Sequence, residues 1–128
     1  MNADNNSGKK KILIIDDDEI HLSMIGFIMA AHGYEVLTAA SGKDAVGLLS
    51  KGIAPDLILL DIIMPDMDGW ETYKNLRAIE HINSVPIAFF TSSNEPEQKE
   101  RAFAMGAADY IIKPFKKDEL LLRVEKLI

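Results

Sequence analysis

The sequence predicts an α/β fold in which a doubly wound parallel sheet is covered by helices on both faces. Five short apolar runs alternate with segments whose apolar residues recur three and four positions apart, as they do in helices. The runs "ILII" and "LILL" lack the alternation of apolar and polar residues that a strand with one wet face shows. Strands buried on both faces are typical of parallel sheets, so these observations together favour this fold class.

Each element can be placed from its pattern and its flanking residues. Strands are expected over "KILIID" (11–16), "YEVLTA" (34–39), "DLILLD" (56–61), "PIAFFT" (86–91) and "DYIIK" (109–113), with helical segments between them. Ser41 is expected to cap the start of a helix, whereas Gly33 and Gly106 fall just beyond helix ends. The chain therefore reads as strand and helix in regular succession.

Length and composition limit the function. The chain of 128 residues is predicted to form one domain over 11–128, after a polar, disordered lead-in at 1–10. With 20 acidic and 14 basic residues the net charge is −6, which argues against a nucleic acid or an anionic membrane as the main partner. The sequence has no cysteine, no membrane-length apolar run and no signal peptide, so a cytoplasmic location is expected.

Polar residues follow four of the predicted strands at the point where each strand ends. They are Asp16 and Asp17 after the first strand, Asp61 after the third, Thr91 at the end of the fourth and Lys113 after the fifth. Taken singly, each has an ordinary interpretation: an aspartate can cap a helix, a threonine can bond the local backbone and a lysine can occupy a turn. Because parallel strands end at one edge of their sheet, the group together predicts a site there.

The stretch "IIDDDEIH" also needs a cation. Two like charges about 4 Å apart repel by roughly 4 kcal/mol at the dielectric of a protein surface. Three carboxylates with few nearby cations make an oxygen-rich site that suits Mg²⁺, Mn²⁺ or Ca²⁺. Mg²⁺ would leave Asp61 free as a nucleophile, while Lys113 and Thr91 would hold phosphoryl oxygens. The residues therefore predict an aspartyl-phosphate site.

The motifs "ILIIDDD", "DLILLDIIMPDMDG", "PIAFFTSS" and "GAADYIIKPF" resemble those of the receiver domain of response regulators in two-component signal transduction. The resemblance covers essentially residues 11–128. It implies a flavodoxin-like sheet of five strands in the order 2-1-3-4-5. The chain ends after its last helical segment, so it resembles a stand-alone receiver, although a domain excised from a longer protein would have the same sequence.

The resemblance also implies roles for individual residues. Asp61 is similar to the phosphoacceptor, Thr91 and Lys113 to the residues that sense and bind the phosphoryl group, and Tyr110 to the aromatic switch. Mg²⁺ (or Mn²⁺) is the implied cofactor, with Asp16, Asp17, Asp61 and the backbone carbonyl of Ile63 as ligands. The Lys113–Pro114 peptide is expected to be cis. Such a domain catalyses only its own phosphorylation and dephosphorylation, with a sensor histidine kinase or a histidine phosphotransfer protein as donor and an unknown protein as target.

Three alternatives remain open at this point. In a phosphatase of the haloacid dehalogenase type Asp16 and Asp18 would form the D-x-D pair, but Ile20 stands where Thr or Val is usual and Asp61 has no role. A flavodoxin-like flavin binder would need a hydroxyl- and glycine-rich phosphate loop, whereas "DDDE" repels phosphate. A receiver-like module that has lost phosphorylation would not be expected to keep every polar residue of the site.

The first helical segment carries no charged residue from 20 to 33, other than its histidines. At 100° per residue its sheet-facing side is expected to comprise Ile25, Ile28, Met29 and part of Met24. Outside lie Phe27 and Ile20, bordered by Met24 and by a flat strip of small residues, Ser23, Gly26 and Ala30. Ile20, Met24 and Phe27 are predicted to dock the helical, histidine-bearing phosphodonor, although a neighbouring loop could instead cover Phe27.

Overall fold

The computed structural model describes residues 8–64 and 67–128 of the chain, and within these ranges five parallel strands form one sheet. The sheet order is β2-β1-β3-β4-β5, as the resemblance implied. The strands are β1 (Lys11–Ile15), β2 (Glu35–Ala39), β3 (Leu57–Leu60), β4 (Ile87–Thr91) and β5 (Asp109–Ile112). Residues 1–7, most of the predicted disordered lead-in, lie outside the described residues.

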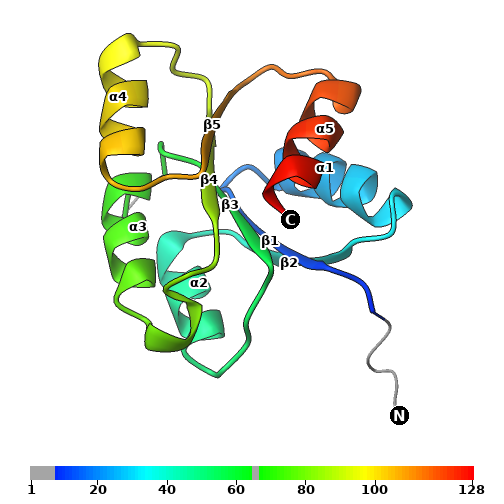
Figure 1. The fold of residues 1–128 in the computed structure, drawn as a ribbon, viewed down its shortest axis with the longest axis horizontal. Helices are drawn as coiled ribbons and strands as arrows, with labels where there is room; N and C mark the ends of the chain where they lie inside the picture. The colour runs from blue at the N-terminus through cyan, green and yellow to red at the C-terminus, as the bar shows by residue number, and fades with distance from the viewer. Residues whose placement is uncertain (1–7, 65–66) are drawn as a thin grey trace.

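Helices cover both faces of the sheet. They are α1 (Glu19–Ala31), α2 (Gly42–Leu49), α3 (Gly69–Arg77), α4 (Pro96–Ala104) and α5 (Lys117–Leu127), with the short 3₁₀ helix η1 (Glu80–Ile82) before β4. Figure 1 shows α1 and α5 on one side of the sheet and α2, α3 and α4 on the other. The predicted doubly wound α/β architecture is therefore confirmed.

The central strands are buried on both faces. In β1, Leu13 and Ile15 pack into the cluster that includes α2, α3 and α4, whereas Ile12 and Ile14 pack into the cluster that includes α1 and α5. This division follows from the two-residue period of a strand. Full burial stabilises each such side chain by about 1.5 to 3 kcal/mol, so apolar residues dominate these strands.

The expected helix signals are found at the ends of the helices. Ser41 caps α2 by accepting a hydrogen bond from the amide of Asp44, and Asp18 caps α1 by accepting from the amides of Ile20 and His21. Beyond α1 and α4, Gly33 and Gly106 adopt φ values of 89° and 104°, which favour glycine. The predicted cap and both glycine stops are therefore confirmed.

Gly69 ties the beginning of α3 to the end of β3. Its amide donates a hydrogen bond to the carbonyl of Ile62 at 2.7 Å. A Cβ at this position would lie 2.5 Å from both the carbonyl oxygen of Asp61 and the Cα of Ile62, which is closer than packed atoms approach. Glycine is therefore required here for α3 to begin against the backbone that carries Asp61.

The orientation of α1 is partly as predicted. Ile25 and Met29 are buried, and Phe27 and Ile20 are each 77% exposed, so the outward position of Phe27 is confirmed. The prediction that Gly26 belongs to an outward strip was wrong, because Gly26 is buried and faces Val36 of β2. Met24, expected to lie partly on the sheet-facing side, is 46% exposed.

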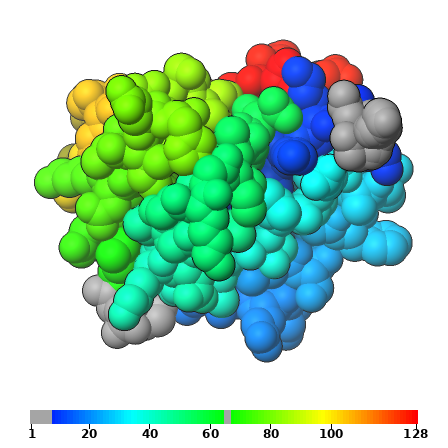
Figure 2. All heavy atoms as spheres, turned by 90° about the horizontal axis from the view of Figure 1, so that it is seen from below, coloured from blue at the N-terminus to red at the C-terminus, as the bar shows by residue number. Residues whose placement is uncertain are grey.

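Figure 2 shows the molecule from the side at which the strands begin. Here the chain from α2 to β3, coloured cyan to green, lies between α1 in blue and the connection from α3 to β4 in yellow-green. The functional candidates lie at the other edge, where the strands end. None of the helices in the described ranges combines the length and the apolar character that crossing a bilayer requires.

Candidate functional site

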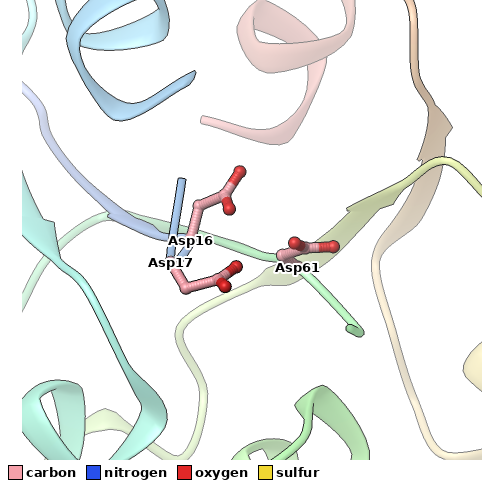
Figure 3. A group of neighbouring side chains, drawn as sticks. All are labelled: Asp16, Asp17 and Asp61. Atoms are coloured by element: carbon pink, nitrogen blue, oxygen red, sulfur yellow. The ribbon is translucent and has the colours of Figure 1, made fainter. Parts of the chain in front are cut away.

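Three aspartates come together at the carboxyl ends of two adjacent strands. β1 and β3 pair with Ile15 opposite Leu60, so the residues that follow them, Asp16 and Asp61, lie next to each other. One carboxylate oxygen from each of Asp16, Asp17 and Asp61 lies within 4.8 Å of the others, and Figure 3 shows the three side chains around one space. Asp16 and Asp61 are buried and Asp17 is exposed, so the group can be reached from solvent.

The donor set suits a hard divalent cation. All three side chains offer carboxylate oxygens at a separation that one ion could bridge, and Mg²⁺ and Ca²⁺ bind such oxygens. The predicted site therefore could hold a metal ion. The side chain of Ile63 is exposed beside the site, and its amide contacts Oδ1 of Asp61 at 3.4 Å. The role of its carbonyl as a ligand remains a prediction.

Lys113 brings a positive charge into this group. Its Nζ lies 2.9 Å from Oδ2 of Asp16 and 3.6 Å from Oδ2 of Asp61, so one ammonium faces both buried carboxylates. Lys113 follows β5, its amide donates to the carbonyl of Thr91 at 2.7 Å, and its peptide to Pro114 is cis, as expected. The ammonium of Lys113 therefore makes direct contact with these acids, at the edge of the sheet where the sequence predicted it.

Thr91 and Tyr110 lie on the neighbouring strands β4 and β5. Thr91 is fully buried, and its hydroxyl accepts a hydrogen bond from the amide of Ser93 at 3.3 Å. Tyr110 is 3% exposed and its hydroxyl donates to the carbonyl of Ser93 at 2.9 Å. Burial and the charge of Glu95 raise the pKa of Tyr110, although the bond to Ser93 opposes them. One loop residue, Ser93, thus connects the two predicted switch positions.

His21 belongs to the site and was missed by the sequence reasoning. Its Nδ1 lies 3.3 Å from Oδ2 of Asp16 and 3.2 Å from Nζ of Lys113. Asp18 begins α1, and this places the ring of His21 in the first turn above the acids. The signal was available: with Asp18 taken as the cap, a polar residue three positions later returns to the same side of the helix.

The site opens into a cleft of about 700 Å³. Its polar lining comprises the acids, His21, Ser92 and Lys113, and its apolar lining comprises Met24, Ile25, Ile63, Pro114 and Phe115. Among the described residues that line it, Lys113 is the one lysine or arginine. The outward face of α1, formed by Ile20, Met24 and Phe27, borders this cleft through Met24.

The two buried carboxylates differ in acidity. Burial raises the pKa of Asp16, but the amide of Asp18 and the ammonium of Lys113 outweigh burial and hold it below 3.8. Burial, reinforced by the charge of Asp16, raises the pKa of Asp61 from 3.8 to about 6 despite the opposing charge of Lys113. Asp61 is therefore the more basic of the two carboxylates, and its negative charge is less well stabilised than that of Asp16.

Comparison with known proteins identifies the family of the chain. The model of the response regulator receiver domain matches residues 12–125. Regulatory protein AtoC of Escherichia coli is 38% identical over 92% of this chain, and the cell cycle transcriptional regulator CtrA of Caulobacter vibrioides is 37% identical over the same share. The chain spans 25% of the first relative and 50% of the second.

Solved structures agree with the sequence comparison. The chemotaxis protein CheY4 of Vibrio cholerae has a TM-score of 0.88 at 32% identity, covering 94% of this chain and 99% of its own. The receiver domain of the sensor histidine kinase PA1611 of Pseudomonas aeruginosa has a TM-score of 0.83 at 29% identity, covering 93% and 97%. That receiver was solved with a magnesium ion coordinated in its active site cleft.

The raised pKa of Asp61 predicts how the stability of the protein depends on pH. Between pH 3.8 and about 6 the folded state binds more protons at Asp61 than the unfolded state, so this group makes stability fall as pH rises. Without metal, Asp61→Asn should raise the free energy of unfolding by about 2 kcal/mol at pH 7.5, and by much less near pH 4. Urea unfolding at both pH values measures this.

The matched control is Asp118→Asn, which replaces an exposed acid in the first turn of α5. It should change the free energy of unfolding by no more than about 0.5 kcal/mol. A stabilisation by Asp61→Asn that is equally large at pH 4 and pH 7.5 would contradict the assigned acidity of Asp61.

Proposed function

The chain belongs to the response regulator receiver domain family, and from that membership we propose that Asp61 accepts a phosphoryl group from a phosphohistidine in a Mg²⁺-dependent reaction. The observation that carries the proposal is the surroundings of Asp61: a buried carboxylate grouped with two further acids, with the ammonium of Lys113 at 3.6 Å. The same domain would then switch protein–protein interactions. The family that the chain matches is the receiver domain, and this favours neither the haloacid dehalogenase nor the flavin-binding alternative.

The carboxylates would hold Mg²⁺ (or Mn²⁺) through Asp16, Asp17, Asp61 and the carbonyl of Ile63. When bound, the ion would supply charge neutralisation at the phosphoryl oxygens. In the transfer, a carboxylate oxygen of Asp61 bonds to phosphorus while the bond from phosphorus to the donor imidazole nitrogen breaks. The electron pair of that bond stays on the imidazole. Asp61 is the more basic of the two buried carboxylates, and because it is buried it has little water to shed when it reacts. Both properties favour its role as the nucleophile.

Lys113 and Thr91 would bind the phosphoryl oxygens of the product. Lys113 already lies 3.6 Å from Asp61, so a short movement of Nζ would bring it to a group attached there. Thr91 ends β4 next to β3, and its hydroxyl is placed by the amide of Ser93. These two groups would take the place of the water molecules that hydrate the oxygens of a free phosphate.

A phosphoryl donor provides the direct test of this chemistry. Wild-type protein incubated with acetyl phosphate and Mg²⁺ should gain the mass of one phosphoryl group, because Asp61 is the nucleophile. Asp61→Asn should gain none, and Asp17→Ala should lose at least about tenfold in labelling rate because the metal loses a ligand. Intact-protein mass spectrometry measures each. Normal, Mg²⁺-dependent labelling of Asp61→Asn would show that another residue is the acceptor.

The switch would use the connection between Thr91 and Tyr110. Movement of the Thr91 hydroxyl towards a phosphoryl group would weaken its bond with the Ser93 amide, and Ser93 also accepts the bond from the Tyr110 hydroxyl. Tyr110 would then turn into the space that the movement of Thr91 frees, altering the surface of α4, β5 and α5. An exposed output face there would suit an unknown downstream protein.

Beryllofluoride, a mimic of the phosphoryl group, tests the switch. Its addition with Mg²⁺ should shift the NMR signals of Tyr110 and Ser93 by more than those of Leu49, the buried last residue of α2, which does not line the cleft. Signals of Tyr110 that stay unchanged while those of Asp61 move would limit the effect to the acceptor itself.

The exposed face formed by Ile20, Met24 and Phe27 would dock the phosphodonor. This face borders the cleft of the acceptor, so a helix seated on it would present a histidine near Asp61. We propose that the partner is the helical, histidine-bearing domain of a sensor kinase or of a phosphotransfer protein, in the cytoplasm. Aromatic residues such as Phe27 commonly provide the largest share of binding energy in such contacts.

Phe27→Asp should slow transfer from a phosphorylated histidine protein by about tenfold or more, because a charge replaces the aromatic anchor. Labelling by acetyl phosphate, which needs no docking, should stay at the wild-type rate. Phe103→Asp on α4 is the matched control, since Phe103 is another exposed phenylalanine, and it should leave both rates unchanged. Equal loss with both donors in Phe27→Asp would mean that Phe27 supports the fold instead.

A further inference from the structure

Two side chains contact the same carboxylate oxygen of Asp16. Its Oδ2 receives Nζ of Lys113 at 2.9 Å and faces Nδ1 of His21 at 3.3 Å, while its Oδ1 accepts from the amide of Asp18 at 3.0 Å. Asp16 is 1% exposed, so these groups, rather than bulk water, surround the carboxylate. The orientation of this carboxylate therefore depends on these three groups.

Lys113 serves two carboxylates at once. Its ammonium contacts Asp16 and lies 3.6 Å from Asp61, and no other lysine or arginine lines the cleft among its described residues. A phosphoryl group on Asp61 carries close to two negative charges in place of the single charge of the carboxylate, and would attract the ammonium strongly. Asp16 would then lose its shortest contact at the moment at which its orientation towards the metal matters most.

His21 is placed to replace that contact. Its backbone amide bonds Oδ1 of Asp18, which anchors the residue in the first turn of α1. From there Nδ1 reaches the same oxygen of Asp16 that Lys113 occupies, and it lies only 3.2 Å from the ammonium itself. Nδ1 carries either a proton or a lone pair, so it can donate to Asp16 or accept from Lys113, but it cannot do both.

We propose that His21 is a positioning residue, which donates from Nδ1 to Oδ2 of Asp16 and holds this carboxylate in its metal-binding orientation when Lys113 moves to the phosphoryl group. This inference rests on the proposed function of Asp61. Groups that bond a metal-binding side chain from behind commonly change metal affinity 10- to 100-fold when they are removed. His21 would have this effect only in the phosphorylated state.

The test compares Mg²⁺ affinity with and without beryllofluoride, in the whole chain. His21→Ala should weaken Mg²⁺ binding about tenfold in the presence of beryllofluoride, and by less than about threefold in its absence, where Lys113 still bonds Asp16. His21→Asn should restore the affinity, because its amide nitrogen is as many bonds from Cβ as Nδ1 is. Titrations followed by NMR measure both.

A spectroscopic signature and a control complete the design. In wild-type protein with Mg²⁺ and beryllofluoride, proton–nitrogen NMR of the imidazole should show the proton of His21 on Nδ1. His32→Ala is the matched control, since His32 lies at the other end of α1 and bonds the carbonyl of Ile28 there. It should bind Mg²⁺ as the wild type does in both conditions.

Three results would overturn the inference: His21→Ala equal to wild type, an equal loss with and without beryllofluoride, or a His21 ring without a proton on Nδ1 in the bound state. Failure of the inference differs visibly from failure of the proposed function. If wild-type protein gains no phosphoryl group and binds no beryllofluoride, the function itself is wrong and the inference falls with it. If wild type does both and His21→Ala matches it, only the role of His21 is wrong.

Discussion

The repulsion between Asp16 and Asp61 is the constraint on which the site depends. Direct pairing of β1 with β3 places these two carboxylates side by side in a buried position, where their mutual charge is costly. The sheet makes this arrangement unavoidable, because both residues follow fully buried strands. Lys113 follows β5 at one edge of the sheet, and its ammonium offsets part of the negative charge of the two carboxylates. Burial, reinforced by the charge of Asp16, still raises the pKa of Asp61, and the three carboxylates could hold a cation.

The same charge balance explains why few residues could suffice for a signalling switch. Among the described residues that line the cleft, Lys113 is the one lysine or arginine. A negative charge added or removed there would therefore redistribute the contacts of Lys113. Movement of Lys113 would affect α1 through its contact with His21. The loop after β4 is connected to β5 by the hydrogen bond that Tyr110 donates to the carbonyl of Ser93. Local electrostatics are thereby connected to two separate surfaces of the domain.

Much of this was readable in the sequence because the strands and their ends are unambiguous. Continuous apolar runs indicate strands buried on both faces, and the polar residue after each run is then forced to one edge, which is why Asp61 and Lys113 could be placed together. Gly26 was misplaced because helical periodicity alone does not say which side of the helix faces the neighbouring strand β2. His21 was missed because its contact with Asp16 depends on where α1 begins, which is set by the cap at Asp18.

The close packing of Gly69 has a mechanical consequence. Gly69, at the start of α3, lies against the end of β3, and its amide donates a hydrogen bond to the carbonyl of Ile62. With no side chain as a spacer, the first turn of α3 rests directly on the backbone of the acceptor. A displacement of the first turn of α3 towards β3 would therefore press on the backbone that carries Asp61, because no side chain lies between them to absorb it.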